Sequence, residues 1–214
     1  MTETQWKKAT DPTAMLAFVA GAASERKLRL FAAACARAVW DHVPEGWMRE
    51  AVGCAERYAD GRAAMEEVGR YRDFLQAMTR RDATPEQLEL VFGAKKAVYA
   101  AVFASVFGTG VAHTLTRAAV WRAFPERHAL LPALIRDLFG NPHRPAAVDP
   151  RWLTSAVVDL ARTIYDSRDF AAMPILADAL EEAGCDNTAL LSHCRSGGPH
   201  VRGCWAVDLV LGNY

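Results

Sequence analysis

The chain has 214 residues, of which 51% are apolar, and it carries 25 basic and 25 acidic residues. This length and apolar content are sufficient for a sizeable hydrophobic core, which excludes an intrinsically disordered chain. The charge balance predicts no nucleic-acid partner, because binding to a phosphate backbone needs an excess of lysine and arginine.

Helices are predicted along nearly the whole chain, because apolar residues recur with a period near 3.6 and no alternating strand pattern is present. Asp11 with Pro12 begins the first helix, and Ser24 caps the second. In chain order, the predicted helices cover residues 12–21, 24–43, 48–61, 62–81, 84–107, a shorter piece up to 124, 126–139, 154–165, 174–184, 188–195 and 200–211. The sequence therefore predicts an all-α fold.

Two of these helices are predicted in more detail. The apolar stripe of the second helix is expected to contain Leu28, Phe31, Cys35, Val39 and His42, and Arg26, Arg29, Arg37 and Asp41 are expected to face away from this stripe. The helix from residue 84 begins with a capping-box pattern at residues 84–87, and Gly108 with Gly110 is expected to break or kink it.

Residues 141–150 form the only connector at which the chain is expected to subdivide, because Pro142, Pro145 and Pro150 impose extended backbone. The connector is short, and the helices after it are too few to bury a core of their own. We therefore expect one domain over residues 1–214, built as an antiparallel bundle of about 8 to 10 helices.

A cytoplasmic protein without a membrane partner is predicted from three features. Residues 1–8 lack the apolar run of a secretory signal, and an odd number of cysteines, five, indicates reduced thiols. The stretch Ala97–Thr116 has no charged residue, but its polar and glycine residues favour a buried helix over a membrane span.

The strongest chemical signal is the segment from Cys185 to Cys204, which holds three of the five cysteines and two of the six histidines. The candidate metal ligands are Cys185, His193, Cys194, His200 and Cys204. His200 and Cys204 are four residues apart on the predicted last helix and would share one face. Cys185 and either His193 or Cys194 would complete a tetrahedral zinc site. Buried thiols with surface histidines, and no cofactor, explain the same residues.

The turn before the last predicted helix is a second candidate site, for an anion. Its free amides lie among the positive charges of Arg195, His200 and Arg202. A plain helix connector is the alternative. Cys204, at the start of that helix, also has some features of a reactive thiol. The pattern identifies no catalytic residue, so the sequence leaves open whether the chain is an enzyme.

The combination of several segments resembles a known family. These segments are Arg26–Ala32, Ala55–Gly61, Leu138–Pro142, Pro174–Glu181 and Gly198–Trp205. Together they resemble a family of uncharacterised all-helical proteins that is abundant in planctomycete-type bacteria and is sometimes labelled SMI1/KNR4-like through neighbouring domains. The resemblance implies a helical fold over almost the full length and implies no reaction, cofactor or catalytic residue.

The function that the sequence favours is a non-catalytic scaffold or interaction module that binds an unidentified protein partner. The alternative is a site on the last two helices, either a structural metal site or an anion-binding thiol centre. The sequence does not specify the oligomeric state.

Overall fold

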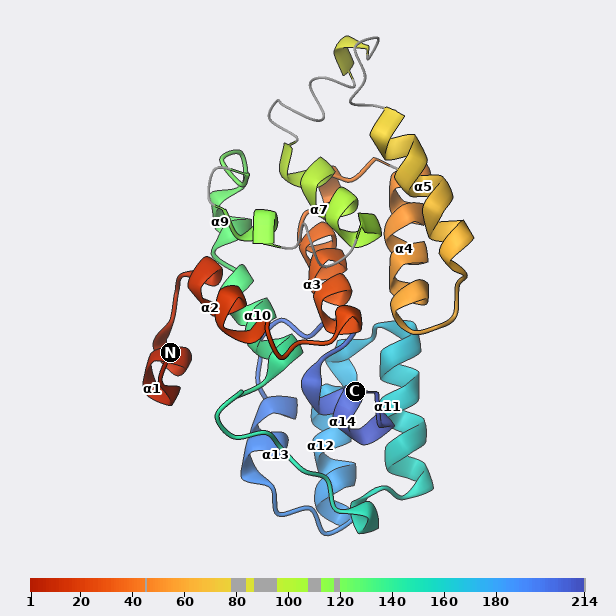
Figure 1. Ribbon diagram of the computed structural model, residues 1–214. Coiled ribbons are helices and arrows are strands. Elements are labelled where there is room, and N and C mark those ends of the chain that lie inside the picture. The colour runs from red at the N-terminus through yellow and green to blue at the C-terminus, as the bar shows by residue number, and fades with distance from the viewer. Residues whose placement is uncertain (45, 78–83, 87–95, 108–112, 118–119, 214) are drawn as a thin grey trace. The chain divides into compact units, whose positions relative to one another are not determined.

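The computed structural model describes residues 1–44, 46–77, 84–86, 96–107, 113–117 and 120–213. Every regular element among these residues is a helix (Figure 1), which confirms the predicted all-α fold class. None of the described helices is long and apolar enough to cross a lipid bilayer. The chain forms two compact units: the first contains residues 1–8 and 133–214, and the second contains residues 9–132. The connector at 141–150 therefore lies inside the first unit, and the single domain stays a prediction.

The second unit is built around helix α3. Its elements are α2 (Pro12–Val19), α3 (Glu25–Ala38), the 3₁₀ helix η1 (Trp40–His42), α4 (Trp47–Ala59), α5 (Met65–Ala77), α7 (Lys96–Phe107), the 3₁₀ helix η2 (His113–Thr116) and α9 (Pro125–His128). Helix α3 packs against α4 and α7, and α5 packs against both of these (Figure 1). Gln87, on which the predicted capping box depends, and the predicted kink at Gly108 and Gly110 lie outside the described residues.

Helix α3 is buried on all sides, so the prediction of a single apolar stripe is wrong for it. Every residue from 28 to 36 is buried, including Arg29, which was expected to face away from the apolar stripe. The predicted cap is present, since Ser24 Oγ accepts a hydrogen bond from the amide of Lys27 at 3.3 Å. His42, expected in the stripe, is exposed, because the α-helix ends at Ala38 and His42 lies in η1.

The guanidinium group of Arg29 closes the carboxy-terminal end of α7. Its Nη1 donates to the carbonyl oxygens of Ser105 and Val106, both at 2.9 Å, and its Nη2 donates to Glu25 Oε1 at 2.9 Å. The ring of Tyr58 lies 4.7 Å from the guanidinium carbon. The last carbonyls of a helix lack intrahelical donors and attract positive charge. These contacts compensate the burial of the arginine and tie α3 to α7.

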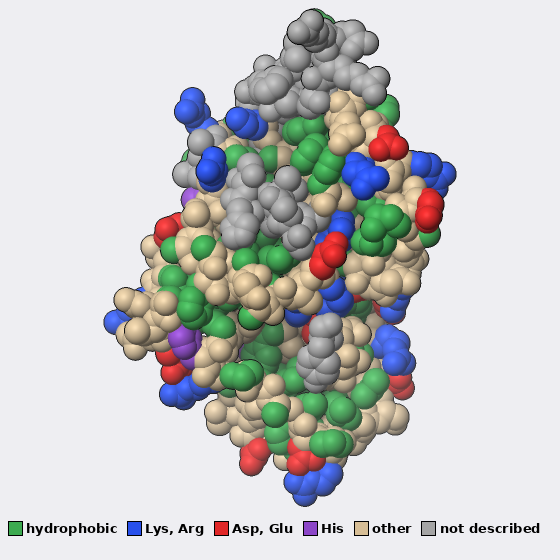
Figure 2. Space-filling model, in the orientation of Figure 1, with side chains coloured by type: hydrophobic (Ala, Val, Ile, Leu, Met, Phe, Trp, Pro, Cys, Tyr) green, Lys and Arg blue, Asp and Glu red, His purple; other side chains and the backbone are tan. Residues whose placement is uncertain are grey.

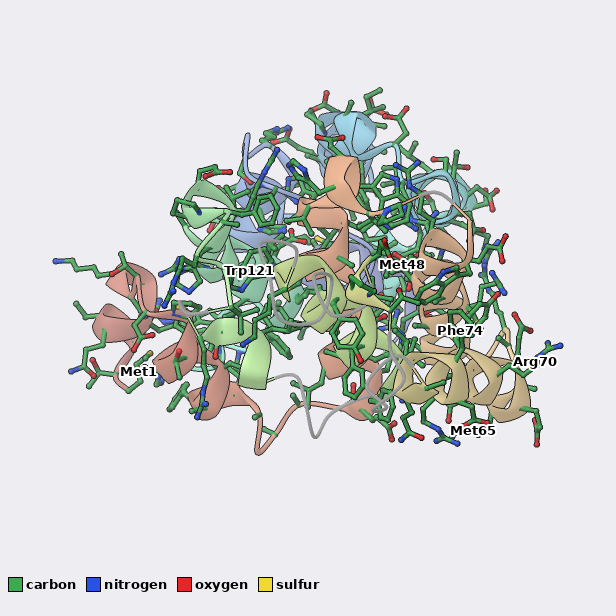
Figure 3. The ribbon with its side chains drawn as sticks, turned by 90° about the horizontal axis from the view of Figure 1, so that it is seen from above. Met1, Met48, Met65, Arg70, Phe74 and Trp121 are labelled. Carbon is green, nitrogen blue, oxygen red and sulfur yellow. The ribbon has the colours of Figure 1, made fainter. Side chains whose placement is uncertain are left out.

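Helix α5 is the observed part of the predicted helix 62–81. Its inner side is formed by Val68 and Leu75, which are buried. Met65, Arg70 and Phe74, labelled in Figure 3, are exposed, and the ring of Phe74 packs against Trp47 of α4 with 4.7 Å between centroids. Along α4 and α5, acidic and basic side chains are intermixed (Figure 2). This flank is therefore half solvated.

The first unit consists of an amino-terminal helix and a carboxy-terminal helical group. Its elements are α1 (Glu3–Lys8), most of α10 (Leu131–Phe139), the 3₁₀ helix η3 (Pro150–Trp152), α11 (Ser155–Ser167), the 3₁₀ helix η4 (Phe170–Ala172), α12 (Met173–Glu182), α13 (Thr188–Cys194) and α14 (Trp205–Leu211). Buried apolar residues of α11 to α14 form its core. The predicted cap Thr154 accepts a hydrogen bond from the amide of Val157 at 3.4 Å, so α11 begins where the sequence indicates.

Two elements at the ends of the first unit differ from the predicted ones. Helix α1 was not predicted, because Trp6 is its only buried residue and one residue gives no periodicity. The predicted helix 126–139 is divided, since α9 ends at His128 and α10 begins at Leu131. Pro132 explains the division, because proline lacks an amide donor and its ring clashes with the preceding turn of a continuous helix.

The last helix begins five residues later than predicted. Helix α14 starts at Trp205, and Cys204 is its N-cap residue. The glycine before it, Gly203, has φ +88°, a left-handed conformation that glycine adopts easily and that interrupts a right-handed helix. His200 and Cys204 therefore do not share a helical face, and any contact between them depends on the fold of the turn.

Candidate metal centre

Four side chains with metal-ligating atoms meet in the first unit: Asp137, His193, His200 and Cys204. Their donor atoms, one from each residue, all lie within 4.8 Å of one another. Asp137 belongs to the last turn of α10 and His193 to the last turn of α13, whereas His200 precedes α14 and Cys204 caps it. The side chains of Asp137 and His200 are 3% and 5% exposed, and Cys204 is fully buried. The protein therefore encloses the cluster.

The distances between the donor atoms are close to those around a tetrahedral metal ion. Asp137 Oδ1 lies 2.8 Å from His200 Nδ1 and 3.1 Å from His193 Nε2. Cys204 Sγ lies 3.1 Å from His193 Nε2 and 4.0 Å from His200 Nδ1. Bonds of about 2.0–2.3 Å to zinc separate tetrahedral ligands by about 3.3–3.8 Å. Shifts of about 1 Å or less would thus produce a coordination sphere.

The cluster differs from a catalytic relay of cysteine, histidine and aspartate. In such a relay, one ring nitrogen of the histidine faces the thiol and the other faces the carboxylate. Here a single atom, Nε2 of His193, faces both Cys204 and Asp137. The fully buried Cys204 sulfur also offers no approach to a substrate. The arrangement is that of donors around one point, which is typical of a metal site.

The groups behind the donor atoms hold two of the four side chains in a ligating orientation. The second carboxylate oxygen of Asp137, Oδ2, accepts a hydrogen bond from the amide of Val201 at 2.9 Å. The second ring nitrogen of His200, Nε2, lies 3.3 Å from the carbonyl oxygen of Ser196. Metal-binding histidines and carboxylates are commonly fixed in this way through the atom that does not bind the metal. Each residue thus directs its free donor atom, Oδ1 or Nδ1, into the cluster.

Local sequence features place the other two donors. The side chain of Asn187 accepts hydrogen bonds from the amides of Ala189 and Leu190, both at 3.1 Å, and starts the short helix that ends beyond His193. The ring of His193 packs against Trp205, with 4.9 Å between centroids. The turn at Gly203 brings Cys204 to the start of α14, so its sulfur lies beside His193.

The charges of Asp137 and His200 stabilise each other. Burial alone would raise the pKa of the Asp137 carboxyl, but hydrogen bonds and charge from His193 and His200 outweigh burial and lower it. Burial alone would lower the pKa of His200, but the Asp137 carboxylate outweighs burial and raises it. Without a metal ion, the two groups therefore form a buried ion pair.

The thiol of Cys204 is neutral without a metal ion. Burial and the nearby Asp137 carboxylate raise the pKa of Cys204 well above its ordinary value, and the amides of Val207 and Ala206 only partly oppose this rise. A bound cation would reverse the balance, because a thiol that coordinates a metal ion loses its proton. The centre is therefore suited to metal binding with release of protons rather than to thiol chemistry.

The pH dependence of stability should reverse when zinc is added. In the metal-free protein, the lowered pKa of Asp137 contributes stability above about pH 3.9, which is lost as pH falls through the folded-state pKa. The raised pKa of His200 contributes stability below about pH 6.5, which is lost as pH rises through its folded-state pKa. Zinc instead requires neutral histidine and binds more tightly as pH rises.

Thermal unfolding at pH 6 and pH 8, with and without one equivalent of zinc, measures this effect. From pH 6 to pH 8, we expect the Tm of the metal-free protein to decrease. Over the same range, the Tm of the zinc-loaded protein should stay constant or increase. For a chain of this size, each 1 kcal/mol corresponds to about 2–4 °C. If the Tm changes with pH in the same way in both samples, His200 does not bind a metal ion.

The structure brings together three of the five residues that the sequence offers as metal ligands. His193, His200 and Cys204 belong to the cluster, although not through the predicted helical spacing. Cys185 and Cys194 lie outside it. Cys194 follows His193 on α13 and points elsewhere, as expected for adjacent helical residues. Burial raises the pKa of Cys194 to about 12, so it is a packed neutral thiol.

Sequence reasoning missed Asp137, the fourth member of the cluster. The residue lies on α10 beside the buried apolar residues Leu134, Ile135 and Leu138, and is itself 2% exposed. A carboxylate that flanks an apolar stripe needs a partner. This signal was available in the sequence, but the partners lie 56 to 67 residues away along the chain.

The three predicted anion-binding residues all face carboxylates of the chain itself. Nη2 of Arg195 donates to Asp178 at 2.8 Å and to Glu181 at 2.6 Å. Arg202 is buried, with its guanidinium carbon 4.6 Å from the ring centre of Tyr165. Arg202 Nη2 also lies 3.8 Å from Asp166 Oδ1, and His200 contacts Asp137. The Asp137 carboxylate thus occupies the place that the turn offers to an anion, and an external anion site stays a prediction.

Comparison with known proteins adds nothing to the geometry of the centre. No protein-family model, no curated protein and no solved structure matches this chain. The resemblance to the helical family of planctomycete-type bacteria therefore stays a prediction.

Proposed function

We propose that the first unit binds one structural zinc ion through Asp137, His193, His200 and Cys204. The observation that supports this proposal is the convergence of four enclosed donor atoms within 4.8 Å. Three of these donors are groups that favour a transition metal, two imidazole nitrogens and a thiolate, and only one is a carboxylate oxygen. Magnesium and calcium prefer sites made of oxygen atoms alone, so zinc fits this donor set better.

A structural role fits the centre better than a catalytic role. Catalytic zinc sites keep one position open for water or substrate, whereas structural sites have four protein ligands. Here the protein supplies all four donors, and the most exposed of them, the His193 side chain, is only 18% exposed. The ion would connect the end of α10, the end of α13 and the start of α14. Its binding free energy would then contribute directly to the stability of this unit.

Metal analysis of protein without a histidine tag tests the proposal. After reconstitution with zinc and desalting, we expect about one equivalent of bound zinc in the wild-type protein. The variants C204S and H193A should each retain less than about a tenth of an equivalent, because each loses one of four ligands. The matched control is C185S, which replaces a buried cysteine outside the cluster and should bind zinc as the wild type does.

Two results would contradict the zinc proposal. One is wild-type protein that binds less than a tenth of an equivalent of zinc. The other is loss of zinc from C185S to the same extent as from C204S, because the ligands would then be those of the sequence pattern rather than those of the cluster.

The wider role that we propose is the one favoured by the sequence, a non-catalytic scaffold or interaction module in the cytoplasm. The enclosure of Cys204 supports the non-catalytic part of this proposal. The exposed apolar residues of the described chain do not single out a partner surface, because only Met65 and Phe74 belong to the same helix, α5. The exposed apolar residues are Phe18, Met65, Phe74, Leu130 and Ile175.

A further inference from the structure

Helix α1 is held on the end of α10 by its only buried residue and by several polar contacts. The indole Nε1 of Trp6 donates to the carbonyl oxygen of Gly140 at 3.1 Å, and Trp6 is 2% exposed. Arg136 Nη2 donates to the carbonyl oxygen of Trp6 at 3.0 Å. Asn141 Nδ2 donates to Glu3 Oε1 at 3.0 Å. The residues that bind α1 thus lie on both sides of Asp137 in the sequence.

A second path of contacts leads from α1 to His193. Gly140, which accepts the hydrogen bond of Trp6, packs so closely on Trp205 that a Cβ added to it would lie 3.2 Å from the indole. Gly140 also has φ +63°, so this position favours glycine for both conformation and space. The ring of Trp205 in turn packs against His193. Helix α1 therefore contacts the end of α10, which carries Asp137, and is linked through Gly140 to Trp205, the neighbour of His193.

We infer that occupancy of the metal centre controls the docking of α1 on the first unit, an inference that rests on the proposed zinc site. A bound ion would fix the last turn of α10 through Asp137 and the position of Trp205 through His193. Gly140, whose carbonyl oxygen binds Trp6, directly follows α10 and packs on Trp205, so a fixed centre would hold this binding site in one arrangement. Coupling between two sites is reciprocal, so docking of α1 must strengthen zinc binding by the factor by which zinc strengthens docking.

The coupling would affect how the two units of the chain are connected. The second unit, residues 9–132, is inserted between α1 and the remainder of the first unit. It is joined to the first unit at both of its ends while α1 is docked. After release of α1, the peptide bond between residues 132 and 133 is the covalent connection of the second unit to the folded part of the first. The zinc centre would thereby act as a metal-dependent latch on one of the two connections.

Hydrogen exchange of the full-length chain, measured by mass spectrometry with Zn²⁺ and after chelation, tests the inference. We expect at least a tenfold slower exchange of the amides of residues 6–8 in the zinc-bound protein. The amides of α4, in the second unit, should change less than twofold and serve as an internal control. The variant C204S should show no zinc dependence at residues 6–8.

Zinc titrations of variants in α1 measure the reciprocal effect. W6A should bind zinc about tenfold more weakly than the wild type, because its α1 no longer docks. W6F keeps part of the packing and loses the indole hydrogen bond, so its affinity should lie between the two. The matched control K7A removes a side chain that is 61% exposed and should change zinc affinity less than twofold.

The results separate this inference from the proposed function. Tight zinc binding with exchange at residues 6–8 that differs less than twofold between the two states would overturn the latch and leave the zinc site intact. Equal zinc affinity in W6A and the wild type would do the same. Absence of zinc binding by the wild type would overturn both.

Discussion

The variant D137A should lose zinc binding and lower the free energy of unfolding of the first unit by about 3–5 kcal/mol. The Asp137 carboxylate lies 3.1 Å from His193 and 2.8 Å from His200. It also accepts the hydrogen bond of the Val201 amide. Its removal leaves the His200 ring and the Val201 amide without their acceptor, which is more costly than the loss of the ion pair alone. Urea unfolding followed by circular dichroism, with and without zinc, measures the loss.

The variant D137N is the matched control for the charge of the carboxylate. Its amide oxygen can still accept the hydrogen bond from Val201, so the metal-free protein should lose less stability than in D137A. Zinc binding should weaken by about 100-fold or more, because changes to the groups that only orient ligands already cost about 10–100-fold. If D137N binds zinc as tightly as the wild type, Asp137 is not a ligand.

The variant R29A should destabilise the second unit by about 3–5 kcal/mol without any effect on zinc binding. It removes the donors for the carbonyl groups of Ser105 and Val106 at the buried end of α7. It also leaves a cavity beside Tyr58 in the space of the guanidinium group. Urea unfolding and the zinc titration described above measure the two effects separately.

The variant E25A separates the exposed ion pair of Arg29 from its buried hydrogen bonds. The Glu25 side chain is 64% exposed, so its pairing with Arg29 should contribute less than about 1 kcal/mol. A loss in R29A no larger than that in E25A would show that the bonds to the α7 carbonyls contribute little to stability.

The sequence predicts most helices because their signals are local. Asp11, Ser24, Thr154 and Asn187 each accept a hydrogen bond from an amide of the helix that they begin. These signals act over two or three residues, and the period of the apolar residues acts over one or two turns. The same logic explains the failure at α1, where a six-residue helix with one buried side chain gives no periodic signal.

The sequence predicts the segment that carries candidate ligands, but it does not predict which of these ligands meet. The density of cysteine and histidine in residues 185–204 indicates a metal site, but helical spacing gave a wrong reason for the contact between His200 and Cys204. The turn at Gly203 brings them together instead, and Asp137 holds that turn through the amide of Val201. Spacing along the chain cannot predict a contact that a distant side chain creates.

The sequence by itself determined that this chain is helical, where most of its helices begin, and which segment carries candidate ligands, because these properties follow from local hydrogen bonds and from apolar periodicity. The tertiary structure alone decided which ligands converge. It excluded Cys185 and Cys194 from the cluster and added Asp137. It also decided that Arg29 is buried. These outcomes depend on contacts between residues that are far apart in the chain, and such contacts are set by the packing of whole helices rather than by the residues next to them.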